Sequence, residues 1–438
     1  MIPLLATIAI VGATLVNLDG GPHLANAVVV IEGERIRGIE GAAPAGAEIL
    51  RAEGLYLLPG FVNLHVHLGL VLPGKMAAEL ADETEAALAL RMASNARKSL
   101  EAGVTTIRIP GDARHADIAL KGAIERGEVR GPRIHSAGEM VDITSGHGAS
   151  GETADGPYEL VKAVRREIGA GATWIKIAIS GGIATPRGDI AEALMTEDEI
   201  EAVVDAAHRF GAKVTAHSGS PQATATAVGL GIDCIEHGYF LTREVLREMK
   251  ARGTFFVPTI VVSQPKTMPF FERIGSPPWY LERVKSVGPR HFEALRMAIE
   301  EGVRIGLGTD QFPFEENDGT TATVRELEYY VEAGMTPVAA LRSATAEAAS
   351  ILGVEKEIGT IDAGKYADLI AVRSDPTRNV SALREIVFVM KGGEVVLASG
   401  ASRPGGSGRA DGAGPRESGR PPRARSEGSA RAEEARAH

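Results

Sequence analysis

The sequence predicts an α/β fold, namely a (β/α)8 TIM barrel with a small β-sandwich module formed from both chain ends. Two observations lead to this prediction. In the middle of the chain, eight short apolar runs alternate with stretches of helical periodicity, which is typical of parallel strands joined by helices. Near both ends, β-rich runs are separated by glycine turns, and neither end has enough strands to bury an apolar face alone.

The module is expected to combine residues 1–59 with residues 356–400. Its first part contains ATIAIVGATLV, NAVVVIEGERIRGIE and EILRAEGLYLLPG, and its second part contains GTIDAGKYADLIAVRSDP and REIVFVMKGGEVVLAS. The opening MIPLLATIAIV is apolar enough for a secretory signal. It lacks a basic start and a convincing cleavage site, so we interpret it as the first strand.

Residues 60–355 are predicted to form the barrel. Its strands are expected at FVNLHVHLG, TTIRIPG, RIHSAG, WIKIAISGG, KVTAHS, CIEHG, FFVPTIVV and RIGLGTD. Its helices include DETEAALALRMASNARKSLEAG, ADIALKGAIERG, GPYELVKAVRREIGAG, TEDEIEAVVDAAHRFG and TTATVRELEYYVEAG, several of which end in glycine. The connection from Ser263 to about Arg296 contains PPWY and is expected to shape or cover the site.

Residues 401–438 are rich in Gly, Pro, Ser, Arg and Ala and almost free of large apolar side chains. We expect this segment to be disordered. Its arginines are interspersed with acids, which favours a solvated tail over a nucleic-acid-binding arm.

Composition limits the partners of the chain. A formal net charge of -10 gives no broad positive field, so a nucleic-acid partner is not expected. No apolar run is long enough to span a bilayer, so no membrane partner is expected either. The lone cysteine, Cys234, cannot form an intramolecular disulfide and favours a cytoplasmic setting. A small-molecule substrate is the expected partner, and the oligomeric state stays open, a homo-oligomer included.

Polar side chains occupy the predicted ends of the barrel strands, where active sites of this fold lie. They are His65 and His67 in the first strand, Lys176 in the fourth, His217 in the fifth, His237 in the sixth and Asp310 in the eighth. Each alone has an ordinary explanation, such as a core histidine or a helix cap. Together, imidazoles and a carboxylate at one end of a barrel predict a metal site, with zinc the expected ion.

Lys176 is the one charged residue in the apolar run TWIKIAIS. Burying an unpaired ammonium is costly and lowers its pKa. The resulting neutral amine can react with carbon dioxide to form a carbamate, whose two oxygens can bridge two cations. The alternatives are a lysine paired with an interior carboxylate and a Schiff-base nucleophile.

These residues, in this order, resemble the amidohydrolase superfamily, specifically its binuclear-metal branch with prolidase-like and imidazolonepropionase-like members. The similarity covers nearly all of the chain before the tail and is strongest in LLPGFVNLHVHLG, GATWIKIAISGG, IEHG, GLGTD and GTIDAGKYADLIAV. It implies that His65 and His67 hold the more buried metal with Asp310, and that His217 and His237 hold the second. Carboxylated Lys176 would bridge the two ions.

This ligand set predicts hydrolysis of an amide C–N bond by a metal-bridging hydroxide. Asp310 would accept the proton of the attacking water and pass it to the leaving amine. An N-acyl amino acid, a dipeptide or a related small amide is the expected substrate. The alternatives are a cyclic amide or lactone hydrolase, a deaminase of the same superfamily, and a scaffold without catalytic activity.

Three further residues are candidates for substrate binding. His147 lies in ITSGHGASGETADGP, which resembles a glycine-histidine loop of the family in which the histidine contacts substrate. Dipeptidase-like members are expected to have a tyrosine two residues after the strand-five histidine, but Gly219 occupies that position, and Tyr239 is a possible replacement or a packing residue. Arg187 can pair with a substrate carboxylate or be a solvated loop arginine.

Overall fold

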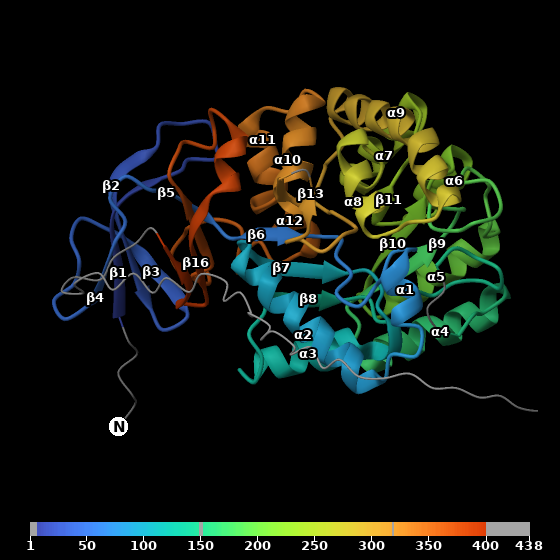
Figure 1. The fold of residues 1–438 in the computed structure, drawn as a ribbon, viewed down its shortest axis with the longest axis horizontal. Helices are drawn as coiled ribbons and strands as arrows, with labels where there is room; N and C mark the ends of the chain where they lie inside the picture. Colours follow the sequence, from blue (N-terminus) through green and yellow to red (C-terminus); the bar gives the residue numbers. More distant parts are fainter. Residues whose placement is uncertain (1–6, 149–151, 318, 400–438) are drawn as a thin grey trace, which may run out of the picture. The chain divides into compact units, whose positions relative to one another are not determined.

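The computed structural model describes residues 7–148, 152–317 and 319–399 (Figure 1). The predicted disordered tail, residues 401–438, lies outside the described residues, as does the first part of MIPLLATIAIV. The strands are β1 (Thr7–Leu15), β2 (Leu24–Glu32), β3 (Arg35–Glu40), β4 (Glu48–Arg51), β5 (Tyr56–Pro59), β6 (Phe61–Asn63), β7 (Val104–Ile109), β8 (Arg133–Ser136), β9 (Trp174–Ala178), β10 (Lys213–Ser218), β11 (Cys234–His237), β12 (Phe255–Val257), β13 (Glu316–Asn317), β14 (Thr320–Thr321), β15 (Leu369–Val372), β16 (Ile386–Lys391) and β17 (Glu394–Ala398).

The α-helices alternate with the central strands. They are α1 (Lys75–Glu79), α2 (Glu85–Glu101), α3 (Ala116–Glu125), α4 (Gly156–Ala170), α5 (Glu197–Arg209), α6 (Pro221–Gly229), α7 (Arg243–Arg252), α8 (Met268–Arg273), α9 (Pro278–Glu301), α10 (Ala322–Glu332), α11 (Pro337–Ser343) and α12 (Ala346–Leu352). Local sequence defines several of their ends. Thr196 and Glu199 form a capping box at the start of α5, and Gly171 ends α4 with a φ of 114°.

The two ends of the chain meet in one mixed sheet, as predicted. Its strand order is β17-β16-β15-β5-β1-β2-β3, with β4 paired to β1 (Figure 1). Strands β5 and β15 connect the two ends by pairing antiparallel from Tyr56 to Pro59, and a bridge between Arg35 and Tyr366 adds a second connection. Between β16 and β17, Gly392 and Gly393 both have positive φ, which a tight two-residue hairpin turn requires.

The central strands pair in parallel and follow one another in sequence order. One sheet contains β6, β7 and β8, and a second contains β9, β10, β11 and β12. A parallel bridge between Val141 and Ile177 connects the segment after β8 to β9. A second bridge, between Phe256 and Ile305, connects β12 to the predicted eighth run.

The eighth run, RIGLGTD, differs from the prediction because it carries an isolated bridge at Ile305 in place of regular strand pairing. Its backbone still contacts the segment after β6, since the N–H of Leu64 donates to the carbonyl of Leu307 at 2.7 Å. Gly308 explains part of the irregularity. A Cβ at this position would lie 2.3 Å from the Val257 side chain and 2.8 Å from that of His65, so the chain must approach its neighbours without a side chain here.

The connection from Ser263 to Arg296 is mostly helical. It contains α8 and most of α9, a long helix that ends at Gly302 with a φ of 73°. Tyr280, in the first turn of α9, is buried. The segment, to which no secondary structure was assigned from the sequence, therefore supplies packed helices beside the strands.

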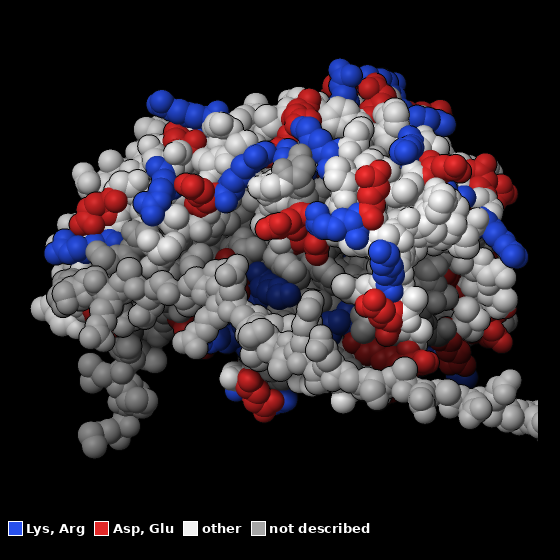
Figure 2. Space-filling model, viewed as in Figure 1, with Lys and Arg blue, Asp and Glu red and all other residues white. Residues whose placement is uncertain are grey.

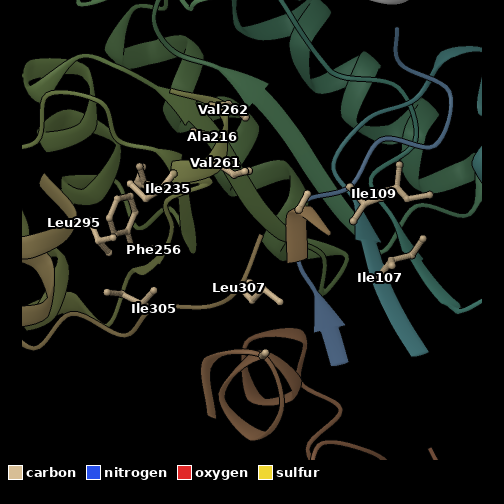
Figure 3. Packing of buried hydrophobic residues seen from close by; sticks show 14 of the residues in the cluster. Ile107, Ile109, Ala216, Ile235, Phe256, Val261, Val262, Leu295, Ile305 and Leu307 are labelled. Atoms are coloured by element: carbon tan, nitrogen blue, oxygen red, sulfur yellow. The ribbon is translucent and has the colours of Figure 1, made fainter. Parts of the chain in front are cut away.

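The main apolar core lies among the parallel strands and the helices that cover them. Figure 3 shows side chains from well-separated parts of the chain converging there, including Ile107, Ala216, Ile235, Phe256 and Leu307. A separate apolar cluster forms the core of the terminal sheet, with Ile10, Leu57 and Phe388 among its members. On the face shown in Figure 2, basic and acidic side chains are interspersed.

Candidate functional site

All the residues predicted to hold metal line one cavity of about 320 Å³. Lys176 projects from β9 and His217 from β10, while His237 is the last residue of β11. β6 ends at Asn63, so His65 and His67 follow the strand and do not lie on it as predicted. Side-chain bonds supplement the backbone bonds at this point, because Asn63 accepts from the backbone N–H of His65 and Arg108 donates to the carbonyl of Leu64.

His65, His67 and Asp310 bring three acceptor atoms together. The Nε2 atoms of the two histidines are 3.2 Å apart and lie 3.1 and 3.3 Å from Asp310 Oδ1. The other ring nitrogen of each histidine donates elsewhere, from His65 Nδ1 to Glu236 at 2.7 Å and from His67 Nδ1 to the carbonyl of Gly111 at 2.6 Å. Both Nε2 atoms therefore lie beside the same carboxylate oxygen, where a cation would be coordinated by all three atoms. Ligand atoms around one tetrahedral zinc ion have about this spacing, roughly 3.4 Å for bonds of about 2.1 Å.

His217 and His237 approach the same point from the neighbouring strands. Their ring centroids are 4.5 Å apart, and that of His237 is 4.9 Å from His65. His217 Nε2 donates to the carbonyl of Gly181 at 3.0 Å, and His237 Nδ1 bonds the Thr259 hydroxyl at 2.7 Å. Burial, with neighbouring imidazoles, holds the pKa of both histidines well below the usual value. Each is thus neutral at physiological pH and has one ring nitrogen free for a metal.

Lys176 lies in this cavity without a fixed partner. Its side chain is buried, and its ammonium makes no hydrogen bond or close ion pair with any residue in the described part of the chain. Burial lowers the pKa of Lys176, against the attraction of Glu236 and Asp310. The lysine paired with an interior carboxylate, one of the alternatives for this residue, would require a contact that the geometry does not contain.

The backbone is strained at three positions of the site. His237, Thr259 and Asp310 have φ values of 65°, 52° and 51°, in the left-handed region that residues other than glycine rarely adopt. Each such residue costs about 1–3 kcal/mol, so packing and hydrogen bonds around it must hold it in place. All three lie at the same ends of the parallel segments, where they aim side chains into or beside the cavity.

A buried ion pair supports the centre from behind and was missed by the sequence analysis. Glu236 accepts from His65 on one oxygen and from Arg108 and Thr215 on the other, and its side chain is fully buried with that of Arg108. The Arg108 guanidinium also packs over the ring of Trp174 at 4.5 Å. A signal was present, because Arg108 is a lone charge in the apolar run TTIRIPG, the same pattern that marked Lys176.

His147 lies at the side of the cavity next to His217. The two rings are 4.1 Å apart, and His147 Nδ1 bonds the hydroxyl of Thr185. Burial lowers the pKa of His147 to about 4, so the ring is neutral. Gly182 permits this arrangement, since a Cβ there would lie 2.3 Å from the His147 ring and 2.7 Å from that of His217.

Tyr239 occupies space that a side chain at residue 219 would need. A Cβ on Gly219 would lie 2.9 Å from the Tyr239 ring and 2.7 Å from the carbonyl of Ile190. The Tyr239 ring stacks on His237 with centroids 5.3 Å apart and planes 15° apart. Tyr239 and Tyr280 both line the cavity, and the sequence analysis did not single out Tyr280.

Arg187 does not fit the role considered for it. It is exposed and is not among the described residues that line the cavity. The loop that carries it is held by Arg283 of α9, which donates to the carbonyls of Gly182 and Gly188 at 2.9 and 3.1 Å. The loop turns Arg187 toward solvent, so a solvated loop arginine is the better description.

Comparison with known proteins agrees with this geometry. The profile of the Amidohydrolase family matches residues 56–397. The chain belongs to the amidohydrolase family. This amidohydrolase is 28% identical to ochratoxinase from Aspergillus niger, over 90% of this chain and 88% of that protein. It is 25% identical to imidazolonepropionase from Pseudomonas fluorescens, over 80% and 88% of the two chains.

The fold has close structural relatives as well. A crystal structure of a Xaa-Pro dipeptidase with methionine in its active site superposes with a TM-score of 0.82 at 30% identity, covering 89% of this chain and 99% of that one. The expected resemblance to prolidase-like and imidazolonepropionase-like amidohydrolases is therefore confirmed. The chain is a hydrolase that acts on carbon–nitrogen bonds. No helix in the described part of this amidohydrolase is both long and apolar enough to cross a membrane.

Proposed function

We propose that this amidohydrolase holds two divalent metal ions, with zinc the expected ion, and uses them to hydrolyse an amide C–N bond. His65, His67 and Asp310 would hold the more buried ion, and His217 and His237 the second. The observation that supports this most strongly is shared by the four histidines: each bonds one ring nitrogen to a protein group outside the proposed ligand set, so that the second nitrogen is available as a metal ligand. Metal-binding histidines are oriented in this way, and the donor set suits zinc.

A carbamate on Lys176 would bridge the two ions. Its amine is buried, unpaired among the described residues and shifted toward the neutral form, which is the form that attacks carbon dioxide. The amine nitrogen bonds the carbon of carbon dioxide and releases a proton, and the product is an anion with two oxygen ligands. With Asp310 it offsets half of the four positive charges of two divalent ions, which keeps the centre electrophilic.

When bound, the ions would supply a water that is deprotonated near neutral pH and would polarise the substrate carbonyl. The protein supplies the remaining steps. Asp310 lies at the centre of the ligand group, so it would accept a proton from the attacking water and donate it to the leaving amine. His147 is neutral and lies beside His217, where it would hydrogen-bond the substrate. Tyr239, whose ring stacks on that of His237, would contribute a hydroxyl to the substrate.

The substrate would be a small amide such as an N-acyl amino acid or a dipeptide. Two similar proteins, an ochratoxinase and a Xaa-Pro dipeptidase, agree with amide cleavage. Opening of a cyclic amide or lactone is the main alternative. A one-metal deaminase has no need of Lys176 as a bridge, and a scaffold without activity would have no reason to keep every free ring nitrogen aimed at the cavity.

We also infer that the parallel segments close into a (β/α)8 barrel. The bridges Val141–Ile177 and Phe256–Ile305 and the Leu64–Leu307 bond support closure, since they connect the two parallel sheets at both edges. The terminal sheet would then be the separate sandwich module of residues 1–59 and 356–400, set against a barrel of residues 60–355. Cys234, buried and without a disulfide partner, suits a cytoplasmic setting.

The experiment is a screen of zinc-loaded protein against N-acyl amino acids, dipeptides, cyclic amides and lactones. The proposal predicts hydrolysis of at least one linear amide that is abolished by a chelator and restored by zinc. Good lactonase activity without cleavage of any amide would overturn the assignment of the bond.

A further inference from the structure

A second, smaller chamber of about 110 Å³ adjoins the metal cavity. The two share the lining residues His67, Leu70, Val71, Leu72 and Asp310, so the chamber begins beside the buried metal site. The rest of its wall is mostly apolar and comes from three parts of the chain, namely Met76 of α1, Phe270 and Ile274 in and after α8, and Phe312 after the eighth run.

The parts of this wall are tied to one another. The backbone N–H of Lys75 donates to the carbonyl of Ile274 at 3.0 Å, which fastens the loop after His67 to the end of α8. Gly74 lets the loop approach, because a Cβ there would lie 2.5 Å from the same carbonyl. Phe312 is held by the ring of Phe314, stacked at 5.5 Å between centroids. The chamber is thus built by packed segments and does not depend on one loose loop.

The mouth of the chamber exposes apolar surface. Leu70 and Met76 are 44% and 49% exposed, and they are two of the few large apolar side chains with so much contact with water in the described residues. Single exposed apolar residues are ordinary, but two beside the same concave site mark a surface that a ligand covers. The charged groups of the wall, Asp310 and Glu315, are both acidic, and the described lining contains no lysine or arginine. The described wall therefore offers no cationic side chain to pair with a charged group on that part of a ligand.

We propose that this chamber binds an uncharged, apolar arm of the substrate, and that Leu70, Leu72, Phe270 and Phe312 determine specificity for it. The proposal rests on the proposed amide hydrolysis, since it places the scissile bond at the metal cavity. An engineered, closed apolar cavity of about 150 Å³ in another protein holds benzene. This chamber is smaller, about 110 Å³, but it opens into the metal cavity, so a phenyl or branched aliphatic group can enter it and extend past its edge. The substrate is then an amide that carries a phenyl or branched aliphatic group, and not a carboxylate, on the arm that enters the chamber.

The test measures binding without turnover. Three hydroxamic acids are titrated calorimetrically into zinc-loaded protein: acetohydroxamic acid, phenylacetohydroxamic acid and N-benzylacetohydroxamic acid. All three share the metal-binding group. Acetohydroxamic acid has no phenyl arm, phenylacetohydroxamic acid carries the arm on the carbonyl side, and N-benzylacetohydroxamic acid carries it on the nitrogen side. We expect one phenyl compound to bind about 10-fold to 100-fold more tightly than acetohydroxamic acid, as for an apolar group in a fitting pocket. Equal affinities for all three would overturn the proposal.

Variants locate the effect. Phe312→Ala should remove most of the gain from the phenyl arm and leave acetohydroxamic acid unaffected, whereas the matched control Phe210→Ala, on an exposed residue after α5, should change neither. Leu70→Glu is a second variant, at a position that is 44% exposed, and it should weaken binding of the phenyl compound as well. Retention of the full gain in both chamber variants would place the arm elsewhere.

Failure of the metal centre gives a different result from failure of the chamber. If no hydroxamic acid binds, the proposed function is wrong, and toluene then tests the chamber alone by ligand-observed NMR. Saturation transfer to toluene in the wild type that is lost in Phe312→Ala supports an apolar binding site. Transfer that is absent, or equal in the two proteins, overturns it.

Discussion

Glu236→Gln tests how far the buried support behind His65 determines metal binding. Glu236 is fully buried, accepts from His65 Nδ1 at 2.7 Å and pairs with the buried guanidinium of Arg108. Glutamine keeps the shape and one acceptor but removes the negative charge. Arg108 is then left as a buried cation without a counter-charge, and His65 loses the carboxylate that sets its tautomer.

The expected effect has two parts. Removing one partner of a buried ion pair costs about 3–5 kcal/mol, and because glutamine retains some hydrogen bonding we expect the lower end, about 3 kcal/mol, in urea unfolding of the metal-free protein. Loss of the outer partner of a metal-binding histidine lowers metal affinity by about 10-fold to 100-fold. A competition titration of zinc against a chelating dye measures this change.

The effect should also depend on pH. Burial raises the pKa of the Glu236 carboxyl, but Arg108 and His65 outweigh burial and hold the pKa below its usual value. A lowered folded-state pKa means that the stabilisation is fully present above the unfolded carboxyl pKa of about 4.3 and is lost at lower pH. The difference in unfolding free energy between wild type and Glu236→Gln should therefore be constant near neutral pH and shrink below about pH 4.

Glu248→Gln is the matched control, because Glu248 forms a half-exposed pair with Arg252 on α7. Such pairs contribute about 0–1 kcal/mol, so this variant should retain nearly full stability and zinc affinity. The reasoning is refuted if Glu236→Gln unfolds at the same urea concentration as the wild type and binds zinc equally well.

Other predictions address the remaining parts of the site. Gly182→Ala should push His147 and His217 out of place and lower kcat/KM by about 100-fold. The control Gly229→Ala, in open space on α6, should leave kcat/KM unchanged. Equal activity of the two variants would contradict the close packing around Gly182. Asp310→Asn should lower kcat by about 100-fold or more at saturating zinc, and a variant that binds both ions yet turns over at the wild-type rate would exclude the proton transfer. Zinc at 100 times its dissociation constant should stabilise the chelator-treated protein by about 2.7 kcal/mol per site in thermal unfolding, and an unchanged melting temperature would argue against bound metal.

The arrangement of the fold followed from patterns that the sequence displays directly. Alternation of apolar runs and helical stretches gave the parallel order of β6 to β12, and the β-rich texture of the two ends gave their pairing through β5 and β15. The eighth run was harder, because Gly306 and Gly308 let the backbone pack too closely for regular strand pairing, and periodicity carries no information on such contacts. No secondary structure was assigned to residues 263–296 from the sequence, whereas the structure has α8 and most of α9 there, with Pro289 inside α9.

Within the site, the sequence indicated residue types but not the bonds that orient them. The histidines were found because imidazoles recurred at strand ends, yet their tautomers depend on distant partners such as Glu236 and the carbonyls of Gly111 and Gly181. Arg187 was considered for substrate binding because a loop arginine near a strand end is a reasonable candidate. The loop that carries it is held by Arg283, more than 90 residues away, so no local pattern could predict that Arg187 is exposed.

The metal content of wild-type protein and of Lys176→Ala tests the central claim most directly. Both proteins are saturated with zinc, freed of excess metal by gel filtration and analysed by mass spectrometry, with hydrolysis of the best amide measured in parallel. The account predicts about two ions per chain in the wild type, a loss of metal and activity in Lys176→Ala, and partial rescue of activity by a short carboxylic acid. A Lys176→Ala protein that holds two ions per chain and remains fully active would contradict it.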